Sequence, residues 1–263
     1  MKWLGKILKA LIVLYLIMCI GLFFAQEKLL FLPHKLDSNH KFRKGIEMKI
    51  QVDDAVELSC LRIESKPAKG AILYLHGNKG NIRRCISQSG NFQNLNYDVY
   101  IPDYRGFGKS GGKLYSEKQM NNDAELVLKE LLKKFKPEQI IVIGYSMGTG
   151  MASYLATKYR FKGLLMIAPF KSLVAMKNKY FPIAPPLIMK YKFRTDKNLE
   201  NIDCPVLIFH GTNDELIPIS DSEELKEDFP DKIKFFKLEG DTHRGCIFDN
   251  KIRTELQRFI QST

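Results

Sequence analysis

The run IIVIGYSMGTGMASYLA, residues 140–156, constrains the fold more than any other part of this chain. Its four leading apolar residues are typical of a buried parallel strand, and an apolar helical pattern follows the glycines. Ser146 lies between the two, inside the pentapeptide Gly-Tyr-Ser-Met-Gly. Small residues on either side let a strand and a helix approach closely, so a sharp turn there would present the hydroxyl in a cleft. A plain glycine-rich turn fits these five residues too, so assigning Ser146 as a nucleophile depends on the rest of the chain.

Strands and helices are expected to alternate along the chain. Short apolar runs predict strands at 71–75, 98–102, 140–143, 164–167, 206–209 and 234–238, and helical spacing predicts helices at 83–95, 116–135, 221–229 and from 249 onward. This alternation predicts an α/β fold with a mostly parallel central sheet and helices on both faces. An antiparallel hairpin is expected at 45–64, at the edge of the sheet. The proline-containing segment 169–203 is expected to be irregular, either a short lid or an ordinary excursion.

The N-terminus carries an uncharged, mostly apolar stretch at 10–25, preceded by three lysines. Counted from Ile7, it is long enough to cross a bilayer. A removable signal peptide is one alternative, but the small-x-small cleavage pattern is missing before Gln26. A buried core helix is the other, and the stretch has no polar face to suit it. We therefore interpret residues 1–28 as an uncleaved anchor and residues 29–263 as one domain.

Basic residues lie on both sides of the apolar stretch. Three lysines precede it and five lysines or arginines follow it between 28 and 44, so the charge rule for membrane orientation gives opposing indications. We expect a single-pass membrane protein with its domain on the extracytoplasmic side.

The charge and cysteine content narrow the classes of partner. The chain has 41 Lys and Arg against 29 Asp and Glu, a net charge of +12. This excess suits an anionic membrane surface better than nucleic acid, because no basic run is interleaved with aromatic residues. The five cysteines are odd in number and form no C-x-x-C pair, so neither a disulfide framework nor a metal site is expected. We expect no cofactor.

A serine nucleophile needs a base, and the base needs an acid to orient it. Asp214 follows the expected strand at 206–209, and His243 follows the one at 234–238. Because the carboxyl ends of parallel strands meet at one edge of the sheet, the three residues are predicted to converge there. Their order, Ser146, Asp214 and then His243, is that of the α/β-hydrolase plan.

Five motifs in this order resemble the α/β-hydrolase-fold serine hydrolases: LYLHGNKGN, DYRGFGKSGG, GYSMG, VLIFHGTNDELIP and GDTH. They are most similar to the small membrane-anchored subgroup that includes monoacylglycerol-lipase-like and protein-depalmitoylase-like enzymes, and the resemblance runs from about Leu29 to the C-terminus. It implies an oxyanion hole made by the backbone N–H groups of Asn78 and Met147. It also implies ester or thioester substrates. The expected anchor would hold the site near a bilayer, which favours lipid or acylated substrates.

Other acids compete for the role of Asp214. Asp241 lies two residues before His243, but the resemblance places the acid after the preceding strand, which favours Asp214. Asp123 lies on an expected helix and is interpreted as structural.

Four further side chains have a structural and a functional interpretation. His76 and His210 precede glycines at strand ends, where loop hydrogen bonding is favoured over a role as catalytic base. Cys246 follows His243 closely, but no strand-to-helix turn presents it, so a structural thiol is favoured over a nucleophile. Arg105 fits the wall of a cleft and a packing role equally well.

These observations predict a serine hydrolase that acts through an acyl-enzyme on small-molecule or lipid esters, or on acylated proteins. Two alternatives stay open. The same site would suit a serine peptidase, and the same fold would suit a non-catalytic binding protein tethered to the membrane.

Overall fold

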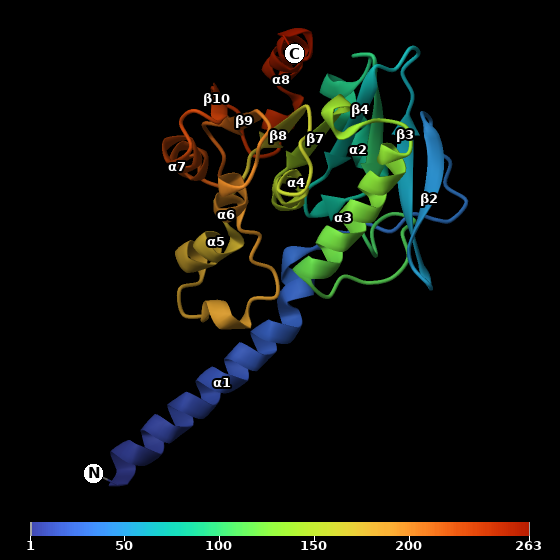
Figure 1. The fold of residues 1–263 in the computed structure, drawn as a ribbon. Coiled ribbons are helices and arrows are strands. Elements are labelled where there is room, and N and C mark those ends of the chain that lie inside the picture. Colours follow the sequence, from blue (N-terminus) through green and yellow to red (C-terminus); the bar gives the residue numbers. More distant parts are fainter. Residues whose placement is uncertain (1, 263) are drawn as a thin grey trace.

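The structure is a computed structural model that describes residues 2–262. Its centre is an eight-stranded sheet in the order β10-β9-β8-β7-β4-β6-β3-β2 (Figure 1). The strands are β2 (Ile46–Asp53), β3 (Val56–Ile63), β4 (Gly70–Leu75), β6 (Tyr97–Pro102), β7 (Ile140–Tyr145), β8 (Gly163–Ile167), β9 (Val206–Gly211) and β10 (Ile233–Leu238). The six strands from β6 to β10 in this order run parallel, while β2 and β3 pair antiparallel at the edge. The predicted α/β fold class and the predicted hairpin are confirmed.

Helices cover both faces of the sheet. They are α2 (Ile82–Gln88), α3 (Glu117–Leu132), α4 (Gly148–Ala156), α5 (Leu173–Tyr180), α6 (Thr195–Glu200), α7 (Ser220–Asp228) and α8 (Asn250–Ser262). Successive strand residues point to opposite faces, so Val142 packs in one core cluster and Ile143 in the other. The first cluster includes residues of α3, α4 and α7, and the second includes residues of α2 and α8. Each fully buried aliphatic side chain stabilises the fold by about 1.5–3 kcal/mol.

Two expectations differ from the structure. The helix expected at 83–95 ends at Gln88 and continues only as a short 3-10 turn to Phe92, because Gly90 lowers helix propensity and Asn94 adopts a left-handed φ of 59°. The segment 169–203 contains two helices, α5 and α6, with a 3-10 turn at Pro186–Ile188 between them. Ser172 caps α5 by accepting a hydrogen bond from the Ala175 amide, 3.0 Å away.

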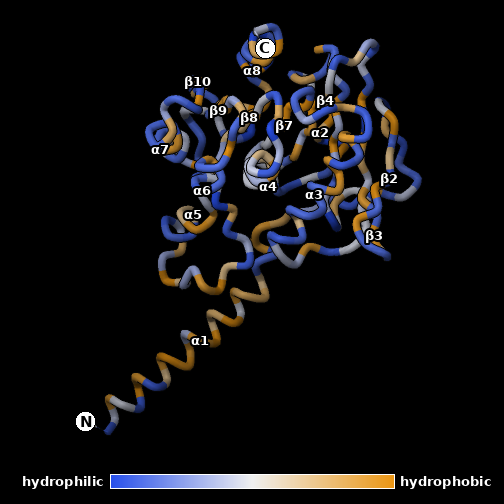
Figure 2. Tube along the Cα trace, viewed as in Figure 1, coloured by the Kyte–Doolittle hydropathy of each residue, from blue (hydrophilic) through white to orange (hydrophobic). Residues whose placement is uncertain are grey.

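The long helix α1 (Lys2–Leu30) extends away from the domain (Figure 1), and Figure 2 shows mostly hydrophobic colour along it, with hydrophilic colour toward its N-terminal end. By length and composition it is able to cross a membrane. Immediately after it, β1 (Leu32–Pro33) pairs with β5 (Lys79–Gly80). This pairing joins the end of α1 to the loop that follows β4.

Candidate active site

Ser146 lies at a strained turn between β7 and α4. Its φ is +51°, a left-handed conformation that side chains rarely adopt, and its amide donates to the Ile167 carbonyl at 2.9 Å. A Cβ added to Gly148 would lie 2.0 Å from the Leu75 carbonyl oxygen, so only glycine lets α4 approach the end of β4 this closely. The sequence predicts such a turn from the two glycines, and the structure has it.

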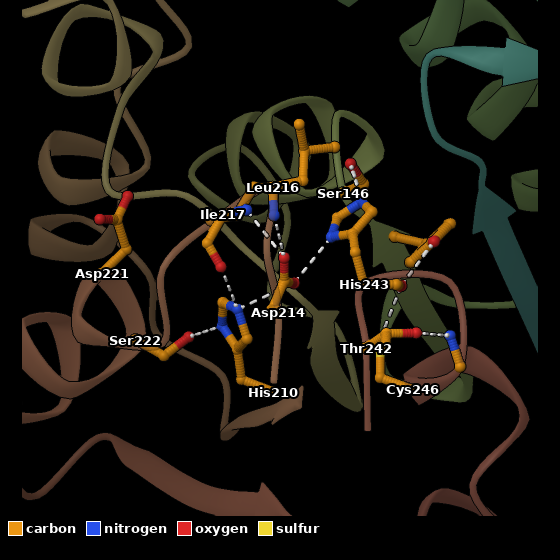
Figure 3. Close-up of polar contacts among 12 residues, drawn as sticks. Ser146, His210, Asp214, Leu216, Ile217, Asp221, Ser222, Thr242, His243 and Cys246 are labelled. Atoms are coloured by element: carbon orange, nitrogen blue, oxygen red, sulfur yellow. Dashed lines mark hydrogen bonds and ion pairs between the residues drawn. The ribbon is translucent and has the colours of Figure 1, made fainter. Parts of the chain in front are cut away.

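The structure brings Ser146, His243 and Asp214 into one hydrogen-bonded chain (Figure 3). His243 Nε2 lies 3.0 Å from Ser146 Oγ, and its Nδ1 lies 2.7 Å from Asp214 Oδ2. Because the carboxylate only accepts hydrogen bonds, Nδ1 carries the proton and the Nε2 lone pair faces the hydroxyl. This arrangement allows His243 to remove a proton from Ser146.

The Asp214 carboxylate is held on all sides. Its Oδ1 accepts hydrogen bonds from the amides of Leu216 and Ile217, at 2.9 and 2.8 Å, while Oδ2 faces His243 and His210. Burial opposes ionisation of the Asp214 carboxyl, but the hydrogen bonds from His210 and His243 outweigh it, and its pKa is well below the usual value. The group is therefore a carboxylate at neutral pH.

His210 stands behind the acid, not beside the serine (Figure 3). Its Nε2 lies 2.9 Å from the Ile217 carbonyl oxygen and 3.2 Å from Asp214 Oδ2, so this nitrogen carries a proton. Its Nδ1 lies 2.6 Å from Ser222 Oγ on α7. His210 thus holds residues 212–219, which carry Asp214 and which we call the acid loop, against α7. No local sequence signal specifies this contact.

Tyr145 supports His243 in a way that the sequence does not suggest. Its hydroxyl donates to the His243 carbonyl at 2.9 Å, and its ring stacks on the imidazole with centroids 5.5 Å apart. The available signal is its position beside Ser146 at the end of β7. Because Tyr145 positions His243 and is followed directly by Ser146, the imidazole and the serine hydroxyl are held at a fixed distance from each other.

Asn78 and Met147 both lie next to the serine. A Cβ added to Gly77 would be 3.4 Å from the Ser146 Cβ, so the loop after β4 passes directly over the turn. The Asn78 carbonyl accepts from the Leu32 amide at 2.8 Å, and its side chain donates to the Leu30 carbonyl at 2.9 Å. Neither the Asn78 nor the Met147 amide donates a hydrogen bond to another residue within 2–262. Both N–H groups are therefore available to an oxyanion.

The competing acids and the thiol lie outside this hydrogen-bonded chain. Burial and the nearby Asp249 raise the pKa of Asp241, which makes no hydrogen bond to His243. Asp123 pairs with Arg105, whose Nε lies 2.7 Å from it. The Cys246 thiol is buried and donates to the His243 carbonyl, and burial raises its pKa, so it is not an activated nucleophile.

The contacts of Arg105 and of His76 support a structural role for each residue. The Arg105 guanidinium also pairs with Asp53, so its charge is held between two carboxylates. His76 Nδ1 lies 2.7 Å from the Gly77 carbonyl oxygen, and burial lowers the pKa of its ring to about 4. Within residues 2–262, no group of histidine, cysteine and acidic side chains is placed to hold a metal ion.

The mostly parallel sheet, the helices on both faces and the strained strand-to-helix turn define the α/β-hydrolase fold. The chain has this fold. A family model described as serine aminopeptidase, S33, matches residues 66–195. Alpha/beta hydrolase domain-containing protein 17C of Xenopus tropicalis is 28% identical over 207 residues, which are 77% of this chain and 66% of that protein. The human protein of the same name is 27% identical, over 77% of this chain and 62% of its own length.

Solved structures show the same fold. The Pyrococcus furiosus esterase Pf2001 superposes with a TM-score of 0.69 at 19% identity, over 88% of this chain and 98% of its own. Est1E of Butyrivibrio proteoclasticus superposes with a TM-score of 0.64 at 18% identity, over 83% of this chain and 98% of its own. This chain spans just under two thirds of the curated relatives that it matches, between 62 and 66% of their lengths.

Proposed function

We propose that this protein is a serine hydrolase that cleaves carboxylic esters or thioesters through an acyl-enzyme. Ser146 Oγ attacks the acyl carbonyl while His243 Nε2 takes the hydroxyl proton. Asp214 orients the imidazole and stabilises its protonated form, and the Asn78 and Met147 amides bind the oxyanion. The protonated His243 then gives its proton to the leaving group. Water, activated by the same histidine, releases the acid and restores Ser146.

One observation carries this proposal: the continuous hydrogen bonds from Ser146 through His243 to Asp214, at 3.0 and 2.7 Å. The test is hydrolysis of a short p-nitrophenyl ester by the purified full-length protein and by its Ser146→Ala variant. The parent should hydrolyse the ester, and the variant should fall to the rate of an enzyme-free control. Equal rates in the two proteins would overturn the assignment.

The substrate class follows from where the site is held. Helix α1 is long and apolar enough to cross a bilayer, and Cys19 is its only buried residue among those described. A site tethered in this way suits lipid esters and acylated proteins, whose acyl chains lie in or at the membrane. Removing residues 1–28 should lower activity on esters embedded in vesicles and spare activity on a soluble ester. Undiminished activity on the embedded ester would refute the link.

A peptidase is the second candidate, because the matching family model is described as a serine aminopeptidase. The same three residues suit amide cleavage as well as ester cleavage. Parallel assays with a p-nitrophenyl ester and an aminoacyl p-nitroanilide decide between the two. We expect a kcat/KM for the ester at least a hundredfold higher, and the reverse order would favour the peptidase.

A further inference from the structure

The turn between α5 and α6 exposes an unusual apolar surface. Residues 180–189, YFPIAPPLIM, contain no charged side chain, and we call them the lid tip. Leu187 is 90% exposed and Ile183 is 63% exposed, and Tyr180 and Phe181 are exposed as well. So many large apolar side chains on one short turn mark a contact surface for something apolar.

Basic residues flank the lid tip on both sides in the sequence. The segment 171–194 has no acidic residue, and its basic residues all lie outside the lid tip: Lys171, Lys177, Lys179, Lys190, Lys192 and Arg194. An apolar tip with basic flanks matches the two layers of a membrane surface, hydrocarbon below and anionic headgroups above. A protein partner would not require this order.

The lid tip is held against the apolar helix α1. The Tyr15 hydroxyl donates to the Ile183 carbonyl at 3.1 Å, and Gln26 Nε2 donates to the Ile188 carbonyl at 2.8 Å. Cys19, on the same face of α1, is only 7% exposed. Lys190 pairs with Glu27 at 3.1 Å, which places the basic flank at the end of the apolar stretch. Figure 1 shows this turn beside the part of α1 nearest the domain.

The depth of the lid tip in the bilayer follows from the geometry of α1. Tyr15 precedes Gln26 by three turns of α1, about 16 Å along the axis at 1.5 Å per residue. Half of a bilayer's hydrocarbon core is about 15 Å thick. If Gln26 and Glu27 lie at the headgroups, Ile183 therefore lies deep within the leaflet nearest the domain.

The backbone of the lid tip suits an environment without water. Prolines 182, 185 and 186 have no N–H group to satisfy. The amides of Ala184, Ile188 and Met189 donate to carbonyls of the lid tip, and the Phe181 amide donates to the Lys177 carbonyl in α5. Tyr15, Lys177 and Gln26 donate to carbonyls of the lid tip. In hydrocarbon an unsatisfied backbone group costs several kcal/mol, so this pairing lowers the cost of insertion; the amides of Ile183 and Leu187 donate to no other residue within 2–262.

We propose that the lid tip inserts into the hydrocarbon of the bilayer that α1 spans, so that the domain contacts the membrane at two places. The inference rests on the proposed membrane anchor and is independent of the proposed chemistry. Its consequence reaches the active site, because the Tyr180 hydroxyl donates to the Leu216 carbonyl at 3.2 Å, two residues from Asp214. The loop that carries Asp214 is thus hydrogen-bonded to the first residue of the lid tip, which couples the insertion to the position of the catalytic acid.

Tryptophan quenching tests the insertion in the full-length protein. The chain has one tryptophan, Trp3, which is replaced by phenylalanine. A single reporter is then introduced at an exposed position: Leu187→Trp in the lid tip, Leu14→Trp in α1, or Phe248→Trp immediately before α8. Each protein is reconstituted in vesicles of anionic and neutral phospholipid whose acyl chains carry bromine.

We expect the lid-tip reporter and the α1 reporter each to lose at least half of their fluorescence relative to unbrominated vesicles. The reporter at 248 should lose less than a tenth, because α8 lies at the far end of the domain from α1 (Figure 1). Quenching at 14 without quenching at 187 would overturn the insertion and leave the anchor intact. Absence of quenching at both positions would overturn anchor and insertion together. Fluorophosphonate labelling of the same samples reports on the chemistry separately.

Discussion

Replacing Asp214 by asparagine should leave the fold intact and reverse the proton positions on His243. In the parent, Asp214 Oδ1 accepts from two backbone amides, and Oδ2 accepts from His243. An asparagine keeps those two amides satisfied only by placing its carbonyl oxygen in the Oδ1 position, which turns its NH₂ group toward the imidazole. His243 Nδ1 must then accept the hydrogen bond, so Nε2 carries the proton and no longer accepts one from Ser146.

The size of the effect follows from losing the base while keeping the geometry. Such a change lowers kcat by about 10⁴-fold in a serine triad, which corresponds to about 5.5 kcal/mol of activation free energy at 1.36 kcal/mol per tenfold. The assay is kcat for p-nitrophenyl acetate with detergent-solubilised full-length protein at pH 8. Circular dichroism and thermal unfolding of the same samples check that the variant is folded.

Asp241→Asn is the matched control. Asp241 is another carboxyl near His243 in the chain, and it makes no hydrogen bond to the imidazole. Its variant should retain kcat within about threefold, because Asp241 lies outside the hydrogen-bonded chain of Ser146, His243 and Asp214. A kcat for Asp214→Asn above one tenth of the parent's, or an equal loss in the two variants, would refute the reasoning.

Three other changes have defined outcomes. Gly148→Ala should lower the free energy of unfolding by about 3 kcal/mol, because the new Cβ would meet the Leu75 carbonyl oxygen at 2.0 Å. Gly90→Ala is the control, since a Cβ there meets nothing within 4 Å. Equal melting temperatures of the two variants would contradict this prediction. Burial raises the pKa of Asp103 to about 8, so its contribution to stability is fully present below pH about 4 and is lost as the pH rises toward 8. Urea unfolding between pH 5 and 8 should therefore show the parent losing stability relative to Asp103→Asn by up to about 1.4 kcal/mol per pH unit, and a constant difference would refute it. Leu187→Asp places a charge in the lid tip, which costs about 3 kcal/mol in hydrocarbon. Turnover of a vesicle-embedded ester should therefore fall at least tenfold, while turnover of p-nitrophenyl acetate stays unchanged. Equal effects on both substrates would contradict insertion.

The strands and the strained turn were accessible from the sequence because each depends on a local pattern. Ile141 and Ile143 belong to an apolar run of strand length, and the glycines around Ser146 are required by contacts with adjacent elements. The convergence of Asp214 and His243 follows from parallel strands, since both residues come directly after a strand that ends at the same edge.

Other features depend on contacts between distant segments. The hydrogen bond between Tyr15 and the Ile183 carbonyl spans 168 residues, and the one between Tyr145 and the His243 carbonyl spans 98. No periodicity or short motif encodes either contact. The prolines of the segment 169–203 weigh against helix and predict irregular structure, but those at 182, 185 and 186 lie between α5 and α6 and leave both helices uninterrupted.

The central claim is that Ser146 is a nucleophile activated by His243. Its most direct test is labelling with a fluorophosphonate probe, which reacts with activated serines, followed by mass spectrometry of the labelled peptide. The account predicts one adduct, on Ser146, in the parent protein, none in Ser146→Ala, and a labelling rate at least a hundredfold lower in His243→Ala. An unlabelled Ser146 in the parent, or a His243→Ala variant that labels at the parent's rate, would contradict it.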